Sequence, residues 1–330
     1  MDIIINIVIL VIAFVALVKG ADMFVDGAAS IAKHFNVSSL IIGLTVVAMG
    51  TSFPELSVSA SAALSGSNEI AISNVLGSNI CNLLLVLGTC AMISPLTVDR
   101  NILKRDFPFM IFATIAMFAA ILIPCISDFI ALSSKDMEAY VGVISRFMGV
   151  ALLAIFVCYI LFLIRESRKS TNAELSEEIP EMISLPKSFL FIIVGIVLII
   201  GGGQGVVYAA RNIASSFGMS ETLIGLTVVA IGTSLPELVT SVVAAHKNEA
   251  GLAIGNAVGS NIFNLLLILG VSSAINPISV NVASIYDMAI LIFVSVITMV
   301  FCSRKKDLNR GEGFVMVLMY AAEIVFSIVR

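Results

Sequence analysis

Long stretches without an ionised side chain alternate with short polar segments along this chain. The uncharged stretches cover residues 3–18, 107–126, 147–164, 189–200 and 288–302. Because a helix needs about 20 apolar residues to cross the hydrocarbon core of a bilayer, this pattern predicts about ten spanning helices. We place them near residues 3–32, 38–64, 69–93, 105–126, 139–165, 187–213, 221–246, 250–275, 282–303 and 312–329.

Composition supports a membrane protein over a large soluble domain. Hydrophobic residues make up 59% of the chain and charged residues only 12%, whereas soluble domains carry about 25% charged residues. There is too little polar sequence to cover a soluble core. We therefore predict an all-α integral membrane protein.

One acidic stretch, residues 166–186, divides the chain into two halves, 1–165 and 187–330, with five expected helices each. It is too short to hold a folded domain, so we interpret it as a linker. Thirteen Lys and Arg residues fall in the loops after odd-numbered helices, against three on the opposite side. By the positive-inside rule, these loops and the linker are cytoplasmic and both termini face away from the cytoplasm of the cell.

The two halves contain a repeated sequence. Residues 43–88 and 225–270 align without a gap at an offset of 182 and are identical at 28 of 46 positions. The first copy contains GTSFPE and GSNICN, and the second contains GTSLPE and GSNIFN. Two units with an odd number of spans must lie in the membrane in opposite orientations. Such inverted repeats are typical of secondary transporters, whose sites lie near the midplane between the repeats.

A glutamate lies midway along an otherwise uncharged span in each copy, Glu55 in the first and Glu237 in the second. A charge at that depth costs at least about 2.5 kcal/mol, so it indicates a functional site. The structural alternative is an ion pair with a buried base. No Lys or Arg occurs at comparable depth in the four repeat helices, and the nearest candidates elsewhere are Lys19 and Arg146.

Oxygen-bearing groups surround each glutamate in the sequence. Hydroxyl residues three and four positions before it share its helical face, and a proline one position before it weakens the helix ladder around Ala48–Gly50 and Ala230–Gly232. The second helix of each repeat adds a polar row. For Asn74, Asn79, Asn256 and Asn261, packing and ion binding remain equally open, and Gly255 and Gly259 form a GxxxG helix contact. The candidate ligands from the residues themselves are Thr51, Ser52, Ser78, Asn82, Thr233, Ser234, Ser260 and Asn264, together with the loosened main-chain carbonyls.

Every candidate ligand atom is an oxygen. Oxygen sites suit hard cations such as Ca²⁺, Mg²⁺, Mn²⁺ or Na⁺ and disfavour Zn²⁺ or Cu⁺. Ca²⁺ takes about 6–8 oxygen ligands in flexible geometry, which two carboxylates with hydroxyls and carbonyls supply. Two carboxylates neutralise one divalent ion or hold Na⁺ instead, and competition for the same oxygens is a physical basis for exchange.

At these motifs the chain resembles the sodium/calcium exchangers of archaeal and bacterial type, in the cation/calcium antiporter superfamily. The paired hexapeptides look like the two α-repeats of that family. The resemblance implies electrogenic antiport of Na⁺ for Ca²⁺ by alternating access, with the first and sixth helices sliding across the rest. It also implies that both glutamates and the side chains named above bind the ions, and that the carbonyl ligands are those of Ala48 and Ala230. Some members carry Asp where Asn264 stands, so this site has two fixed carboxylates and K⁺ co-transport is not expected.

Other functions remain open at this point. The same fold and site would serve an H⁺-coupled antiporter of Ca²⁺, Mg²⁺ or Mn²⁺. A channel is disfavoured because two inverted copies give a two-fold pocket and not a ring of oxygens. An intramembrane enzyme is disfavoured because GTSFPE lacks the GxSxG frame and no His lies at matching depth. We expect no cofactor, no nucleic-acid or protein partner, and the lipid bilayer as surroundings. In the first helix we expect Asp22 and Asp26 to pair with Lys19 and Lys33.

Overall fold

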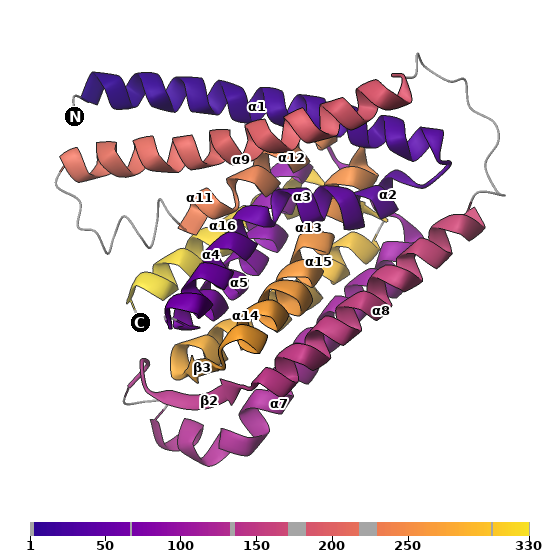
Figure 1. Ribbon diagram of the computed structural model, residues 1–330. Helices are drawn as coiled ribbons and strands as arrows, with labels where there is room; N and C mark the ends of the chain where they lie inside the picture. The colour runs from indigo at the N-terminus through magenta and orange to yellow at the C-terminus, as the bar shows by residue number, and fades with distance from the viewer. Residues whose placement is uncertain are drawn as a thin grey trace.

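The protein is a bundle of long apolar helices (Figure 1). The computed structural model describes residues 3–66, 68–132, 136–170, 183–217, 230–304 and 306–329. Within these ranges, eight helices are long and apolar enough to span a membrane, and a pair bent by 49°, Ser39–Thr51 with Phe53–Ser65, makes a ninth. The helix expected over 221–246 and the linker expected over 166–186 lie partly outside the described residues. The predicted all-α membrane fold is confirmed, and the count of ten stays a prediction.

Two 32-residue helices, α1 (Ile3–His34) and α9 (Leu185–Ser216), lie side by side across one face of the bundle (Figure 1). They are antiparallel, because Ser30 near the end of α1 meets the start of α9, while Asn212 near the end of α9 donates to Asn6 near the start of α1. A Cβ added to Gly202 would lie 2.6 Å from a main-chain nitrogen of α1. Small residues thus bring the two backbones into direct contact, as in other membrane helix pairs.

The repeats fold into short, interrupted helices beneath this pair. The first consists of α2 (Ser39–Ile42), the π-helical turn η1 (Gly43–Val47), α3 (Ala48–Thr51), α4 (Phe53–Ser65), α5 (Asn68–Cys81), η2 (Asn82–Val86) and α6 (Leu87–Ile93). The described part of the second consists of α11 (Ala230–Thr233), α12 (Leu235–His246), α13 (Ala250–Phe263), η5 (Asn264–Ile268) and α14 (Leu269–Ile275). The π-helical turns η2 and η5 begin at equivalent positions, Asn82 and Asn264, so the two copies fold alike in this part of their described residues.

The predicted GxxxG contact is confirmed. Helix α13 runs along α2 and η1 so closely that a Cβ on Gly255 would lie 2.7 Å from the Leu40 carbonyl oxygen. One turn later, a Cβ on Gly259 would lie 2.9 Å from the Leu44 carbonyl oxygen. This contact joins the second repeat to the broken helix of the first.

Within the described residues, four short strands that were not expected from the sequence join the two halves. Strand β1 (Leu96–Thr97) pairs with β4 (Asp307–Leu308), and β2 (Tyr140–Ile144) pairs with β3 (Ile278–Asn281), all antiparallel. Each strand that follows a repeat pairs with a strand from the other half of the chain. The helix expected from residue 139 is wrong over β2, where β-branched and aromatic residues favour an extended strand.

The remaining long helices form the outer faces of the bundle. They are α7 (Phe107–Leu132), which follows the turn η3 (Ile102–Asp106), α8 (Arg146–Ser170), α15 (Val282–Arg304) and α16 (Arg310–Val329). Many large apolar side chains on these helices and on the first half of α1 are exposed, which fits a surface that faces lipid. The described start of α1 and end of α16 lie toward one side of the ribbon, and the end of α8 and the start of α9 lie toward the other (Figure 1).

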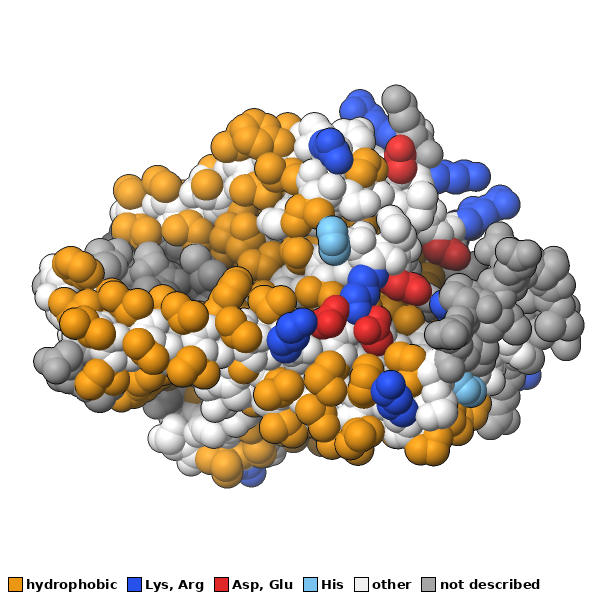
Figure 2. Space-filling model, turned by 90° about the horizontal axis from the view of Figure 1, so that it is seen from above, with side chains coloured by type: hydrophobic (Ala, Val, Ile, Leu, Met, Phe, Trp, Pro, Cys, Tyr) orange, Lys and Arg blue, Asp and Glu red, His pale blue; other side chains and the backbone are white. Residues whose placement is uncertain are grey.

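The expected pairing within the first helix is wrong. Asp22 and Asp26 both pair with Lys247, in the turn between α12 and α13, at 2.7 Å and 2.6 Å from its Nζ. The ion pairs therefore tie α1 to the second repeat. Seen from above, Figure 2 shows charged side chains gathered over one part of the molecule, while hydrophobic side chains cover the opposite end.

Candidate cation-binding site

The broken helices position the two glutamates. The chain leaves helical geometry at Ser52, with φ −87° and ψ 7°, and at the equivalent Ser234, with φ −89° and ψ 3°. A new helix starts directly after each break, with its proline in the first two positions and Glu55 or Glu237 in its first turn. The first turn of a helix stabilises negative charge through unpaired N–H groups and the helix dipole. Each break therefore creates a helix start that stabilises a buried carboxylate.

Both carboxylates are buried inside the protein. The exposed fraction is 0% for Glu55 and 1% for Glu237, and the two groups interact electrostatically. Ser52, from the first repeat, donates from Oγ to Oε1 of Glu237, in the second repeat, at 2.9 Å. Among the described residues, no Lys or Arg forms an ion pair with either glutamate.

Several carboxylate, amide and hydroxyl atoms are buried without a hydrogen-bond partner in the described part of the chain. Burying such atoms unpaired costs free energy, so they mark a place built for something that binds oxygen. Carboxylate and amide oxygens with hydroxyls are ligands for hard cations. The atoms that belong to candidate ligands are Glu55 Oε1 and Oε2, Glu237 Oε2, Ser234 Oγ, Ser260 Oγ, Asn264 Oδ1 and both amide atoms of Asn82.

The other candidate ligands differ in their surroundings. Thr51 donates from Oγ1 to Oδ1 of Asn256 at 3.0 Å, so its hydroxyl is already bonded to the second repeat. The Ala48 carbonyl accepts the N–H of Ser52 at 3.1 Å. Ser78 is buried in α5, Thr233 is half-buried at the end of α11, and Ala230 begins that helix.

The sequence left the role of four asparagines undecided, and two of them donate hydrogen bonds to the main chain at the glutamates. Asn74 donates from Nδ2 to the Glu55 carbonyl at 3.4 Å and to Ser59 Oγ at 3.0 Å. Asn256 repeats this arrangement, donating to the Glu237 carbonyl at 3.4 Å and to Ser241 Oγ at 2.9 Å. In these contacts each asparagine links its own helix to the glutamate helix of the same repeat.

The two serines that accept these hydrogen bonds, Ser59 and Ser241, were not predicted from the sequence. Ser59 and Ser241 are both buried. A usable signal was present, since each lies four residues after its glutamate, on the same helical face, and is identical in the two copies.

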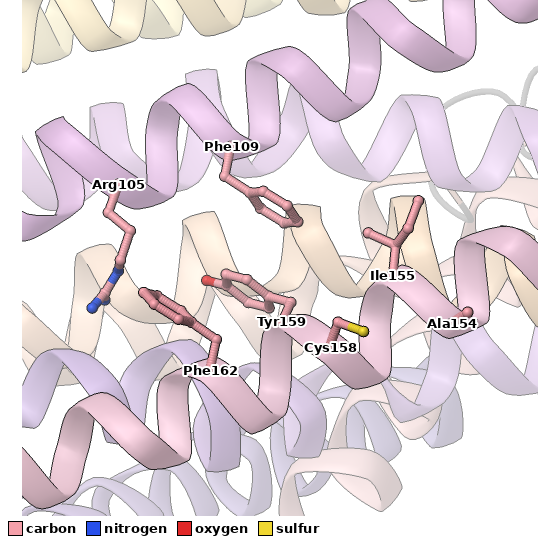
Figure 3. Close-up of a pocket in the computed structure, with 7 residues that line it drawn as sticks. All are labelled: Arg105, Phe109, Ala154, Ile155, Cys158, Tyr159 and Phe162. Carbon is pink, nitrogen blue, oxygen red and sulfur yellow. The ribbon is translucent and has the colours of Figure 1, made fainter.

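A groove of about 400 Å³ on the outside of the bundle lies apart from this site (Figure 3). Seven residues line it: Arg105, Phe109, Ala154, Ile155, Cys158, Tyr159 and Phe162. Arg105 binds the buried Asp106 through two hydrogen bonds, and Tyr159 donates a third to the same carboxylate at 3.0 Å. The groove is otherwise apolar and opens between α7 and α8, so it belongs to the lipid-facing surface.

Comparison with known proteins matches this architecture. The model of the sodium/calcium exchanger protein family matches residues 5–165 and 187–329. Sodium/calcium exchanger MaX1 of Methanosarcina acetivorans is 33% identical over 342 residues, covering 97% of this chain and 98% of the relative. Inner membrane protein YrbG of Escherichia coli is 33% identical over 317 residues, covering 93% and 92%.

Solved structures give the same result. The sodium-calcium exchanger NCX_Mj soaked with 10 mM Na⁺ and 10 mM Sr²⁺ superposes with a TM-score of 0.80 at 33% identity, covering 98% of this chain and 99% of that one. The same exchanger soaked with zero Na⁺ and Ca²⁺ superposes with a TM-score of 0.80 at 31% identity over the whole of both chains. The chain is therefore a multi-pass membrane protein of the sodium/calcium exchanger family, whose members are cation antiporters.

Proposed function

We propose that this protein exchanges Na⁺ for Ca²⁺ by alternating access at the site formed by Glu55 and Glu237. The observation that carries the proposal is the pair of buried carboxylates, supplied by equivalent positions of the two repeats and linked by Ser52. Three of their four oxygens have no hydrogen-bond partner in the described residues. Two negative charges match one Ca²⁺, and the same oxygens can hold Na⁺ instead, so binding of one ion excludes the other.

The membrane arrangement belongs to the same proposal. The antiparallel α1 and α9 occupy equivalent places in the two halves, which supports inverted repeats with domains 1–165 and 187–330. In such transporters the site lies near the midplane. We place the linker on the cytoplasmic side and both termini on the other side, from the distribution of basic residues.

The proposed ligands complete a single oxygen-lined site. They are Glu55, Thr51, Ser52, the Ala48 carbonyl, Ser78 and Asn82, with Glu237, Thr233, Ser234, the Ala230 carbonyl, Ser260 and Asn264. With Asn at both 82 and 264, the site carries two carboxylates and not three. K⁺ is therefore not a proposed substrate.

Transport in liposomes tests the coupling ion. Purified protein is reconstituted with Na⁺ inside, and Ca²⁺ uptake is followed after dilution into Na⁺-free medium, with a pH gradient imposed in parallel. Uptake that requires internal Na⁺ is expected. Uptake driven only by the pH gradient would keep the site and assign it to H⁺-coupled antiport, because buried carboxylates also carry protons. No Ca²⁺ movement under either gradient would contradict Ca²⁺ as the substrate.

A further inference from the structure

Two equivalent asparagines, Asn79 in α5 and Asn261 in α13, are bonded to each other's main chain. Asn79 donates from Nδ2 to the Asn261 carbonyl oxygen at 3.3 Å. Asn261 donates from Nδ2 to the Asn79 carbonyl oxygen at 3.0 Å. Both side chains are buried. The reciprocal pair joins the second helix of one repeat to that of the other.

This pair fixes which way the Asn79 amide points. A main-chain carbonyl only accepts hydrogen bonds, so the atom of Asn79 that meets Asn261 must be Nδ2. Oδ1 is then the other atom, and it accepts a hydrogen bond from Nδ2 of Asn264 at 3.0 Å. The amide of Asn264 is therefore fixed as well, with its Oδ1 buried and without a partner in the described residues.

The first repeat lacks the equivalent contact. Asn82 occupies the position of Asn264, and neither of its amide atoms has a hydrogen-bond partner among the described residues. Oδ1 of Asn261, the equivalent of the acceptor in Asn79, is also without a partner there. Both asparagines thus make the reciprocal main-chain bonds, but of the two only Asn79 also accepts a hydrogen bond from a candidate ligand.

We propose that Asn79 is a positioning residue for the cation site, which holds Asn264 by its amide nitrogen so that the amide oxygen is the atom available to the ion. This inference rests on the proposed function. An amide oxygen attracts a cation, whereas the NH₂ group of a reversed amide has only donor hydrogens with partial positive charge and repels it. Without the acceptor on Asn79, nothing in the described contacts of Asn264 prevents that reversal.

The Ca²⁺ dependence of transport provides the first test, with Asn261→Ala as the matched control. Asn79→Ala and Asn261→Ala each remove one of the two reciprocal main-chain bonds, but only Asn79→Ala frees Asn264. Loss of a residue that orients a metal ligand typically weakens metal binding about 10- to 100-fold. We expect the KM for Ca²⁺ to rise by that factor in Asn79→Ala and by less than about threefold in Asn261→Ala, since that variant leaves the ligand in place.

A double-mutant cycle separates positioning from general damage. In an Asn264→Ala background the added Asn79→Ala change is expected to leave the KM for Ca²⁺ unchanged, since the positioned group is already gone. Asn79→Leu, which fills the side-chain volume, gives the same comparison where the alanine variant does not fold. Equal KM effects at Asn79 and Asn261, or full additivity with Asn264→Ala, would overturn the inference alone. Absence of Ca²⁺ transport by the wild-type protein would overturn the proposed function and this inference with it.

Discussion

Neighbouring glycines in α9 give opposite predictions for the same substitution. A Cβ on Gly202 would lie 2.6 Å from the Leu17 nitrogen and 2.8 Å from the Ala13 carbonyl oxygen, whereas a Cβ on Gly201 would meet no atom within 4 Å. The closest approach at Gly202 is about 1 Å shorter than the separation of about 3.5 Å at which nonbonded heavy atoms attract. Because the obstructing atoms belong to a backbone, α1 and α9 must separate to admit the methyl group.

The magnitudes follow from general packing energetics. Overpacking costs about 1–3 kcal/mol, while replacing a helical glycine by alanine gains about 0.5–1 kcal/mol where space is free. Gly202→Ala is therefore expected to lower stability and Gly201→Ala to leave it equal or higher. Because the glycine-to-alanine gain is common to both, the two variants should differ by the overpacking cost alone, about 1–3 kcal/mol.

Thermal unfolding in one detergent, followed by loss of the monodisperse protein peak, measures this difference. A transport assay on the same samples adds a functional comparison, because Gly203, the next residue of α9, lies against Pro236 at the second glutamate helix. We expect reduced Ca²⁺ transport only in Gly202→Ala. Equal melting temperatures for the two variants would refute the close antiparallel contact of α1 and α9.

Three further predictions concern contacts around the site. Lys247→Met should destabilise the protein by about 0.2–1 kcal/mol, as for exposed ion pairs, and the effect should shrink in high salt. Burial opposes the charged form of Lys247, but its hydrogen bonds and charge pairing with Asp22 and Asp26 outweigh that and raise its pKa. The stabilisation by these ion pairs is fully present below the unfolded-state pKa of about 10.4 and should be lost as pH rises through the higher pKa of the folded state. Melting curves of the wild type and Lys247→Met, compared across this pH range, measure the loss. Asn256→Ala should cost about 1–3 kcal/mol by leaving buried partners unbonded, as measured by thermal unfolding. Removing Ca²⁺ with a chelator should lower the melting temperature, since ligand at a hundredfold excess over Kd stabilises by about 2.7 kcal/mol, and Glu55→Gln should abolish this shift.

Much of the fold followed from two features of the sequence, the uncharged stretches and the repeat. The repeat located the glutamate helices, and the spacing of Gly255 and Gly259 predicted a contact that the structure confirms. These predictions succeeded because they depend on local pattern. A glycine pair four residues apart, or a proline beside a glutamate, has the same physical consequence wherever its partner helix comes from.

Contacts between distant segments were not predictable in this way. The pairing of Asp22 and Asp26 with Lys19 and Lys33 was inferred from spacing within one helix, but Lys247, more than 200 residues away, lies closer in the fold. Strand β2 looked helical because its apolar run continues directly into α8. Its own residues favour a strand, and its distant partner β3 stabilises that extended form by supplying main-chain hydrogen bonds.

The residues of the proposed site could be named from the sequence, but their hydrogen bonds could not. Spacing placed Asn74 and Asn256 on the same helical face as other candidate ligands, yet their amide groups bond the main chain at the glutamates. Sequence spacing cannot distinguish an amide that faces an ion from one that holds a neighbouring helix. The partner atoms decide, and they come from another helix of the repeat.

Equilibrium Ca²⁺ binding to the purified protein tests the central claim most directly. Wild type, Glu55→Gln and Glu237→Gln are compared with Glu138→Gln, which removes an exposed glutamate outside the site. The account predicts Ca²⁺ binding that Na⁺ displaces in the wild type and in Glu138→Gln, and its loss in both site variants. Unchanged Ca²⁺ affinity in folded Glu55→Gln or Glu237→Gln protein would contradict the claim that these two carboxylates form the cation site.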